Sequence, residues 1–338
     1  MLNIGIIGLG SMGMTHFSAY AALPKVRVVA VADQKFSRPE GAVGRAGNIA
    51  GQSSTVDLTG VKKYVTAEEL LADPEVTAVD ICTPTLLHKA LALAAIRAGK
   101  TAVLVEKPLA RTAAEAREVL AVAEEKGALL FPAHCMRFWP GWDWLKKAVA
   151  EARYGAVQSA AFSRLGAKPP VPLYNDAAAI GGAHLDLHIH DADFVQHVFG
   201  RPTAVTSFGR AGESGAIEHT ITHYHFSGSD ALVTAEGGWT RDAEKIPFVM
   251  RYAVTFERAT AVYELGEKPS LRLYQAGKSA EEIPLADALG YANELAEFVR
   301  CAREGKPSPL VSGADGVAAL ELIEAELESI AAGKTINL

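Results

Sequence analysis

The chain opens with the apolar stretch Ile4-Gly5-Ile6-Ile7, and Gly8-Leu9-Gly10-Ser11-Met12-Gly13 follows at once before a helical pattern. In this setting the first glycine of G-x-G-x-x-G permits a tight turn, the second lets the backbone approach a pyrophosphate, and the third allows close helix packing. Free amides at the helix N-terminus then hold the anion. The stretch predicts a dinucleotide site made by Gly8, Leu9, Gly10, Ser11, Met12 and Gly13.

The second predicted strand ends at Asp33, 25 residues after Gly8 (33 minus 8). A carboxylate at this place can accept hydrogen bonds from both ribose hydroxyls and repel a 2′-phosphate. The sequence therefore predicts NAD rather than NADP as the cofactor. Lys35 and Arg38 follow closely and could instead bind that phosphate, so NADP stays open as the alternative.

Short apolar, β-branched runs alternate with longer helical periods over the first 132 residues. The runs are 4–7, 28–32, 79–82, 102–105 and 128–131. Continuous apolar strands separated by helices indicate a parallel sheet that is covered on both faces. Residues 1–132 are therefore predicted to form a doubly wound, dinucleotide-binding α/β domain.

The pattern changes after Pro132. Between about residues 203 and 275 hydrophobic and polar residues alternate with period two, as in 219–226 and 250–256, and helical patterns at 291–304 and 315–332 close the chain. Alternation of this kind is typical of a mostly antiparallel sheet. Residues 133–338 are predicted to form a second α/β domain.

Composition narrows the class of protein. The 338 residues are 49% hydrophobic and 21% charged, which suits two globular domains. The net charge of -6 gives no reason to expect binding to nucleic acid or to an anionic membrane. Three widely spaced cysteines do not suit a disulfide framework, and neither a signal peptide nor a long apolar span is apparent. We therefore expect a cytoplasmic protein.

Two segments fall at the edge of the parallel sheet where ligands bind. Glu106-Lys107-Pro108 ends one strand, and its lysine is expected to face the cofactor, although a solvated lysine is common at such a place. The preceding strand ends in Cys82-Thr83-Pro84-Thr85-Leu86-Leu87-His88. Its backbone is expected to line the nicotinamide side, so Thr83, Pro84, His88 and Glu106 join the predicted cofactor site. His88 could equally cap the next helix.

The segment from Gly181 to Asp193 is dense in histidine and aspartate. If it is helical, Asp186 and His190 lie at i and i+4 on one face. A carboxylate beside an imidazole orients the ring and stabilises its protonated form, as a general base requires. A metal site including His184 and His188, or a structural role for some of these groups, remains an alternative. Because hydride transfer needs no metal beside such a pair, we predict none.

These motifs together resemble the glucose-fructose oxidoreductase/inositol dehydrogenase/MocA (Gfo/Idh/MocA) family. The resemblance extends over essentially the whole chain and rests on the glycine motif and on five further stretches, which are 83–88, 106–108, 137–140, 181–190 and 294–298. It implies a Rossmann domain followed by an α/β domain with an open, predominantly antiparallel sheet, which is often used for oligomerisation. It also implies NAD(P)-dependent redox chemistry at a secondary alcohol or ketone.

The resemblance places Lys107, Asp186 and His190 on the catalytic positions of the family, and Pro108 on a proline that a cis peptide often precedes. We expect His190 to act as base, Asp186 to orient it, and Lys107 to stabilise the developing alkoxide. Substrate contacts are expected from these three residues and from His134, Arg164, Tyr174 and Trp239. For the tryptophan and the arginine, burial in the core or exposure at the surface is the competing interpretation.

The favoured function is hydride transfer between nicotinamide and a secondary alcohol or ketone of a sugar, an inositol-like polyol or a glycoside. One alternative is an enzyme of this fold that uses transient oxidation for elimination, glycoside cleavage or epimerisation. The other is a dinucleotide-binding regulator without catalysis. A homo-oligomer, dimer or tetramer, assembled through the C-terminal sheet is also expected.

Overall fold

The computed structural model describes residues 1–37, 56–240 and 247–338 and divides them into two compact units. The first comprises Met1–Cys135 and Leu289–Ala318, and the second Met136–Ala288 and Ala319–Leu338. The first break lies close to the predicted boundary at residue 132. The return of 289–318 to the first unit differs from the predicted division into two continuous segments.

The first unit is built on a six-stranded parallel sheet in the order β3-β2-β1-β4-β5-β6. Its strands are β1 (Leu2–Ile7), β2 (Val26–Ala32), β3 (Lys62–Tyr64), β4 (Ala78–Ile81), β5 (Ala102–Glu106) and β6 (Leu129–Ala133). All residues of β4 and β5 are buried, as expected for strands covered on both faces. The doubly wound sheet predicted from the apolar runs is confirmed.

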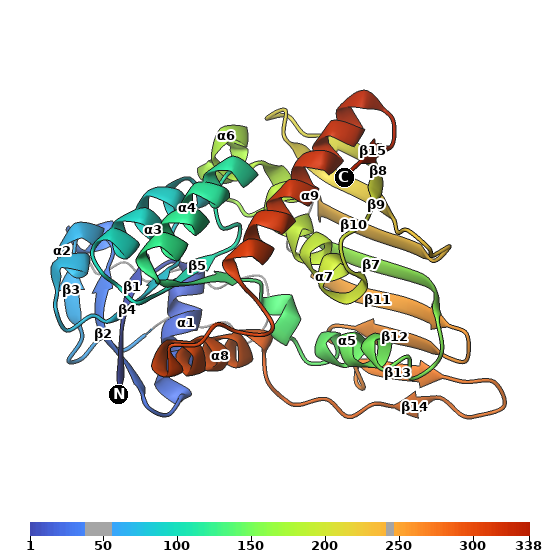
Figure 1. Cartoon of the computed structure of the whole chain (residues 1–338), viewed down its shortest axis with the longest axis horizontal. Coiled ribbons are helices and arrows are strands. Elements are labelled where there is room, and N and C mark those ends of the chain that lie inside the picture. Colours follow the sequence, from blue (N-terminus) through green and yellow to red (C-terminus); the bar gives the residue numbers. More distant parts are fainter. Residues whose placement is uncertain (38–55, 241–246) are drawn as a thin grey trace. The chain divides into compact units, whose positions relative to one another are not determined.

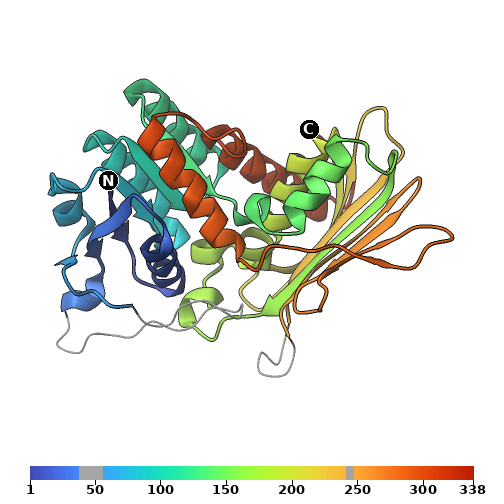
Figure 2. The same cartoon turned by 90° about the horizontal axis from the view of Figure 1, so that it is seen from below.

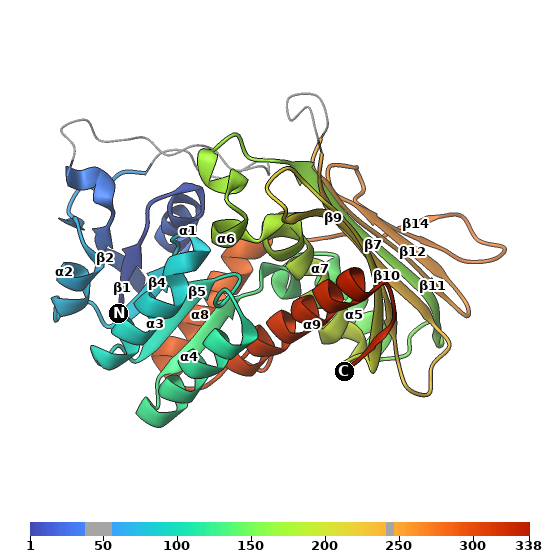
Figure 3. The ribbon, with the colours of Figure 1, turned by 90° about the horizontal axis from the view of Figure 1, so that it is seen from above.

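Helices cover both faces of this sheet, with α2, α3 and α4 grouped together and α1 beside α8 (Figures 1 and 3). Their bounds are α1 (Ser11–Ala22), α2 (Ala67–Ala72), α3 (His88–Arg97), α4 (Ala113–Lys126) and α8 (Gly290–Glu304), with short 3-10 turns at Gln34–Ser37 and Thr85–Leu87. At the start of α2 the Thr66 hydroxyl accepts from the amide of Glu69, whose carboxylate accepts from Thr66 in return.

The second unit contains a nine-stranded sheet in the order β14-β13-β12-β11-β7-β10-β9-β8-β15. Its strands are β7 (Val157–Ala167), β8 (Ala204–Ala211), β9 (Ile217–His225), β10 (Leu232–Thr240), β11 (Val249–Phe256), β12 (Thr260–Glu264), β13 (Leu271–Tyr274), β14 (Glu281–Glu282) and β15 (Ile336–Asn337). β7 and β10 run parallel and the other pairs antiparallel. The mostly antiparallel sheet is therefore confirmed.

Within the second unit the helices lie on one face of this sheet (Figures 2 and 3). They are α5 (Trp142–Ala150), α6 (Ala177–Ile180), α7 (Ile189–Phe199) and the later part of α9 (Gly313–Ala332), joined by 3-10 turns at Cys135–Phe138 and Pro172–Asn175 and by a π-helical turn, η5 (His184–His188). Trp142 is fully buried between them and the sheet, with its ring 4.7 Å from Phe194 and 5.6 Å from Tyr252. Among the described residues, helices long and apolar enough to cross a bilayer are absent.

Candidate active site

The glycine motif forms the turn between β1 and α1. Gly8 has a φ of +92°, a left-handed conformation that favours glycine. A Cβ on Gly13 would collide with the carbonyl oxygen of Gly8, whereas a Cβ on Gly10 would meet nothing within 4 Å. Open space at the second glycine is what a pyrophosphate approaching the backbone requires. The motif therefore fits a dinucleotide phosphate at the start of α1.

Asp33 follows the end of β2 and is held against the glycine turn. Its carboxylate accepts hydrogen bonds from the amides of Leu9 (2.7 Å) and Lys35 (2.9 Å). Lys35 directs its ammonium group to the carbonyl oxygen of Leu9 at 3.1 Å. Arg38, the other residue expected to favour NADP, lies outside the described residues.

Lys107 comes directly after β5, at the carboxyl edge of the parallel sheet, and is half-buried. The peptide bond between Lys107 and Pro108 is cis, as the resemblance implied. The backbone amide of Lys107 donates to the carboxylate of the preceding residue, Glu106, at 3.0 Å. The position of Lys107 is therefore tied to that of a buried acid.

Glu106 belongs to a buried network that the sequence did not predict. The imidazole of His16, on α1, has Nδ1 2.9 Å from an oxygen of Asp80 and Nε2 3.3 Å from an oxygen of Glu106. Burial opposes protonation of His16, but Cys82 and Asp80 beside it outweigh burial, so its pKa is raised. Burial likewise opposes ionisation of Glu106, but its bond to His16 prevails and lowers its pKa. A charged imidazole thus bridges two carboxylates beneath Lys107.

His88 joins the two loops at this edge. Its ring nitrogens lie 2.7 Å from the carbonyl oxygen of Pro108 and 2.8 Å from that of Thr83. Burial lowers the pKa of His88. With both ring nitrogens against the backbone, His88 is placed to hold the loop after β4 against the loop that carries Lys107, rather than to point at a ligand.

In the second unit, the residues of the segment from η5 into α7 differ in burial. Asp186 and His190 are both half-buried, one helical turn apart, whereas His184 and His188 are fully buried. The predicted acid/base pair thus shares the accessible side of the segment, and the other two histidines face the core.

Two buried ion pairs fix α7, the helix that carries His190. Arg164, on β7, binds Asp191 with bonds of 2.7 and 3.1 Å, and Arg137 binds Asp193 with bonds of 2.9 and 2.6 Å. Bidentate pairing of a guanidinium with a carboxylate fixes geometry as well as charge. The first pair joins α7 to strand β7 and the second joins it to the turn Cys135–Phe138, so both fix the helix that carries His190.

The buried histidines contact a glutamate that lies far away in the sequence. His188 Nε2 is 3.0 Å and His184 Nε2 3.6 Å from Oε2 of Glu326, on α9, and the Tyr224 hydroxyl donates to Oε1 of Glu326 at 2.8 Å. Burial lowers the pKa of His184 to about 4. Burial also opposes charging of His188, but Glu326 prevails and raises its pKa. We call these four residues the Glu326 network.

Ligand atoms of His184, His188 and Glu326 lie within 4.8 Å of one another, as do those of His16, Asp80 and Cys82. Either group has donors that could hold a metal ion. In each group, however, a histidine with a raised pKa, His16 or His188, is already paired with a carboxylate. Asp186 and His190 belong to neither group.

The four residues expected to line a substrate pocket are placed in different surroundings. His134 and Arg164 are buried, and the guanidinium of Arg164 lies 5.3 Å from the ring centre of Trp142 in addition to its pairing with Asp191. This placement favours a structural role for Arg164. Tyr174 and Trp239 are half-buried and pack edge to face, with ring centres 5.8 Å apart.

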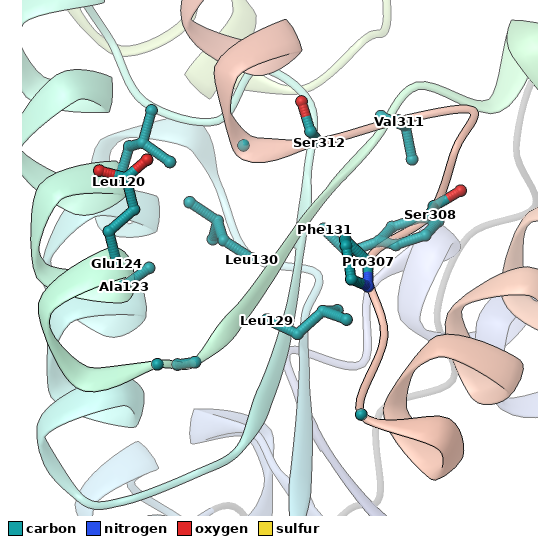
Figure 4. A pocket seen from close by; sticks show the side chains of 14 residues that line it. Leu120, Ala123, Glu124, Leu129, Leu130, Phe131, Pro307, Ser308, Val311 and Ser312 are labelled. Carbon is teal, nitrogen blue, oxygen red and sulfur yellow. The ribbon is translucent and has the colours of Figure 1, made fainter.

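An apolar cavity of about 260 Å³ in the first unit lies between α4, β6 and the loop 305–313 (Figure 4). Leu120, Leu130 and Val311 are among its lining side chains, and Glu124 supplies its one carboxylate. Groups for redox or acid/base chemistry are otherwise missing from its lining, so we do not connect it with the candidate active site.

Sequence patterns predicted roles for Lys107, Asp186 and His190 but did not predict the buried networks of His16 and of Glu326. Asp80 carried a usable signal, because a carboxylate inside the apolar strand 79–82 must find a partner when buried. Tyr224 and Glu326 carried no local signal, since each sits in an ordinary alternating or helical pattern.

Comparison with known proteins identifies the family of this chain. Residues 2–134 match the model described as oxidoreductase family, NAD-binding Rossmann fold, and residues 142–262 match the GFO/IDH/MocA C-terminal domain. The chain is 29% identical over 355 residues to inositol 2-dehydrogenase of Rhizobium meliloti (strain 1021), covering 100% of this chain and 99% of the relative.

A further relative is 1,5-anhydro-D-fructose reductase of Ensifer adhaerens, 31% identical over 297 residues that cover 82% of this chain and 85% of the relative. A solved structure of levoglucosan dehydrogenase in complex with NADH and levoglucosan has the same fold, with a TM-score of 0.83 at 23% identity over 99% of both chains. The chain belongs to the Gfo/Idh/MocA family and is an NAD(P)-dependent oxidoreductase with an NAD-binding Rossmann domain.

Proposed function

We propose that this protein oxidises a secondary alcohol of a sugar, an inositol-like polyol or a glycoside, or reduces the corresponding ketone, with NAD preferred over NADP. The observation that carries the proposal is the pair Asp186 and His190, half-buried on one side of a segment whose other histidines are turned into the core. Relatives that act on inositol and anhydrofructose support the class of substrate.

In the proposed oxidation His190 takes the proton of the substrate hydroxyl. Asp186 orients the imidazole and stabilises its protonated form. The ammonium group of Lys107 stabilises the negative charge that develops on the substrate oxygen. Bound NAD supplies the acceptor for the hydride that leaves the same carbon. In the reverse direction His190 returns the proton to the oxygen.

The preference for NAD rests on Asp33. Its carboxylate is fixed by two backbone amides beside the glycine turn, where it can accept from the ribose diol and repel a 2′-phosphate. Lys35 supports this assignment because its ammonium group is held by the carbonyl oxygen of Leu9. Thr83, Pro84 and Glu106 remain proposed neighbours of the nicotinamide half, at the same edge as Lys107.

Self-association through the second sheet is part of the proposal. Three apolar side chains on its strands are exposed, with exposed fractions of 70% for Phe208, 46% for Ile221 and 60% for Leu232. Phe208 and Ile221 are direct partners in the pairing of β8 with β9. Light scattering after size exclusion would show a dimer or tetramer for the parent chain and dissociation for Phe208→Glu.

The test of function is an assay of purified protein with NAD against inositols, monosaccharides and glycosides. Absorbance of the reduced cofactor and analysis of the products are followed together. We expect stoichiometric ketone and reduced cofactor. Elimination, cleavage or epimerisation without net reduction of NAD would favour transient oxidation, and NAD binding without turnover of any compound would favour a regulator.

A further inference from the structure

A second cavity, of about 560 Å³, lies in the second unit where β7 and β10 end. This volume is within the range of about 300–1,000 Å³ usual for small-molecule sites. We call it the β7/β10 cavity. Its lining consists of Lys168, Asn175, Glu213, Ser214, Glu218, Trp239 and Thr240.

Both strands that end in this cavity contact the histidine segment, as does β9. A Cβ on Gly237 would come within 2.6 Å of the Cβ of His188, and Trp239 follows Gly237 by two residues. A Cβ on Gly182, just before the segment, would collide with the carbonyl oxygen of Ile217 near the cavity rim. Strand β10, which ends in the cavity, thus packs on the core side of the segment that also carries Asp186 and His190.

The lining has the chemistry that suits a hydroxylated ring. Trp239 supplies an aromatic surface, braced by the edge of Tyr174, on which the apolar C–H face of a sugar can pack. Asn175 and Ser214 can donate and accept hydrogen bonds. The hydroxyl of Thr240 is buried and bonds to no group in residues 1–37, 56–240 or 247–338. That hydroxyl can both donate a hydrogen bond to a ligand and accept one from it.

The charges of the lining disfavour an anion. Among the described residues of the lining Lys168 is the single cation, and its ammonium group is already 2.6 Å from an oxygen of Glu218 and 5.2 Å from the centre of the Trp239 ring. Glu213 adds a second carboxylate, so these described lining residues carry a net charge of -1 (one lysine against two glutamates). A phosphate or carboxylate on the ligand would therefore meet like charge.

We propose that the β7/β10 cavity binds an uncharged glycosyl unit joined to the ring that is oxidised, so that the substrate is a neutral glycoside or oligosaccharide. This inference rests on the proposed function. It assigns the cavity to the part of the substrate that does not react. Free monosaccharides would leave the cavity empty, and sugar phosphates would be disfavoured by its carboxylates.

The experiment compares neutral disaccharides of glucose and galactose in several linkages with the free monosaccharides and with glucose 6-phosphate, all with NAD. We expect kcat/KM for the best disaccharide to exceed that of its monosaccharide by at least about tenfold, the factor set by about 1.4 kcal/mol of added binding. Glucose 6-phosphate should be the poorest. A monosaccharide or the phosphate as best substrate would overturn the inference while the proposed function stands.

Two variants test whether the β7/β10 cavity causes the preference for a disaccharide over its monosaccharide. Trp239→Leu and Thr240→Val should each reduce the ratio of disaccharide to monosaccharide kcat/KM, mainly through KM for the disaccharide. Thr234→Val, on the same strand but outside the cavity lining, is the matched control for Thr240→Val. An unchanged ratio in both cavity variants, with folded protein by circular dichroism, would contradict the assignment.

Calorimetry of NAD-saturated protein separates this inference from the proposed function. If no sugar is oxidised, the proposed function fails. Disaccharide binding that Trp239→Leu and Thr240→Val weaken, and that Thr234→Val leaves intact, would still support the cavity as a glycosyl site. Absence of binding to every disaccharide would overturn it.

Discussion

Tyr224 donates a hydrogen bond from its hydroxyl to Oε1 of Glu326 across 2.8 Å, which ties strand β9 to helix α9 inside the second unit. His188 approaches the other oxygen of the same carboxylate at 3.0 Å. A carboxylate in the core is tolerable only when such partners surround it. The histidine segment therefore rests on a charge pair rather than on apolar packing alone.

Glu326→Gln should lower the free energy of unfolding of the second unit by about 1–3 kcal/mol, because the partners of a buried charge are left partly unsatisfied. Urea unfolding followed by tryptophan fluorescence measures it, since all four tryptophans, 139, 142, 144 and 239, lie in this unit. Glu328→Gln, at an exposed site on α9, is the control. Equal effects of the two variants would contradict the role of the network.

The contribution of the pair His188/Glu326 to the free energy of unfolding should fall at both high and low pH. The pKa of His188 is raised above 6.5. Its contribution to stability is therefore complete below pH 6.5 and is lost as pH rises through the folded-state pKa. The pKa of Glu326 is lowered below 4.5. Its contribution to stability is therefore complete above pH 4.5 and is lost as pH falls through the folded-state pKa. The difference between parent and Glu326→Gln should be greatest between pH 4.5 and 6.5.

Arg164→Met should destabilise the second unit by about 3–5 kcal/mol, because it leaves the carboxylate of Asp191 buried without its partner. The double change Arg164→Met with Asp191→Asn should recover part of that loss, since the uncompensated charge is gone. The same urea experiment on both single variants and the double variant gives the coupling. Arg201→Met breaks an exposed pair with Glu321 and should change stability by less than about 1 kcal/mol.

Sequence patterns predict structure within one strand or one helical turn, but not contacts between residues far apart along the chain. Periodicity located the apolar strands, and spacing along one helical turn predicted the pair Asp186/His190, because such patterns lie within one strand or one turn. It missed β3, whose residues Lys62–Tyr64 form a short polar edge strand without an apolar run. His16 and Asp80 are 64 residues apart, and Tyr224 and Glu326 are 102 apart. Such pairs are set by tertiary packing, which leaves no local pattern.

The parent chain should bind NAD at least about tenfold more tightly than NADP, a factor that corresponds to about 1.4 kcal/mol. The reason is repulsion between the carboxylate of Asp33 and a 2′-phosphate. Titration by protein fluorescence with each dinucleotide measures the ratio, and Asp33→Ser should reduce it. Tighter binding of NADP to the parent would instead assign the phosphate to Lys35 and to Arg38.

Lys107→Met should reduce turnover by at least about 100-fold, the size of effect seen when one electrostatic stabiliser of a transition state is lost. Binding of NAD should remain close to that of the parent, because the buried contacts of His16 with Asp80 and Glu106 are unchanged. Lys89→Met removes a half-buried ammonium group, paired with Glu118, from α3 and serves as the control. Turnover within a few-fold of the parent would make Lys107 an ordinary solvated lysine at a strand end.

Asp186 and His190 should both be needed for the full rate of alcohol oxidation. His190→Ala should lose roughly 100-fold or more in rate of alcohol oxidation, and Asp186→Asn should also slow the reaction because an amide stabilises an imidazolium less well than a carboxylate does. Binding of NAD to both variants should stay close to that of the parent, because neither residue belongs to the predicted cofactor site, and fluorescence titration measures it. A loss of rate accompanied by an equal loss of stability in urea would indicate a structural role instead.

The same variants decide whether a metal takes part. If acid/base chemistry at His190 is sufficient, dialysis against a strong chelator leaves turnover unchanged, and His184 and His188 affect stability more than rate, since both lie in the core with Glu326. If a metal at the His184/His188/Glu326 group drives the reaction, chelation abolishes turnover, zinc or manganese restores it, and His184→Ala costs as much rate as His190→Ala. Elemental analysis of the purified protein beside these rates distinguishes the two, and stoichiometric metal with chelator-sensitive turnover would refute the metal-free mechanism while leaving the dinucleotide domain unaffected.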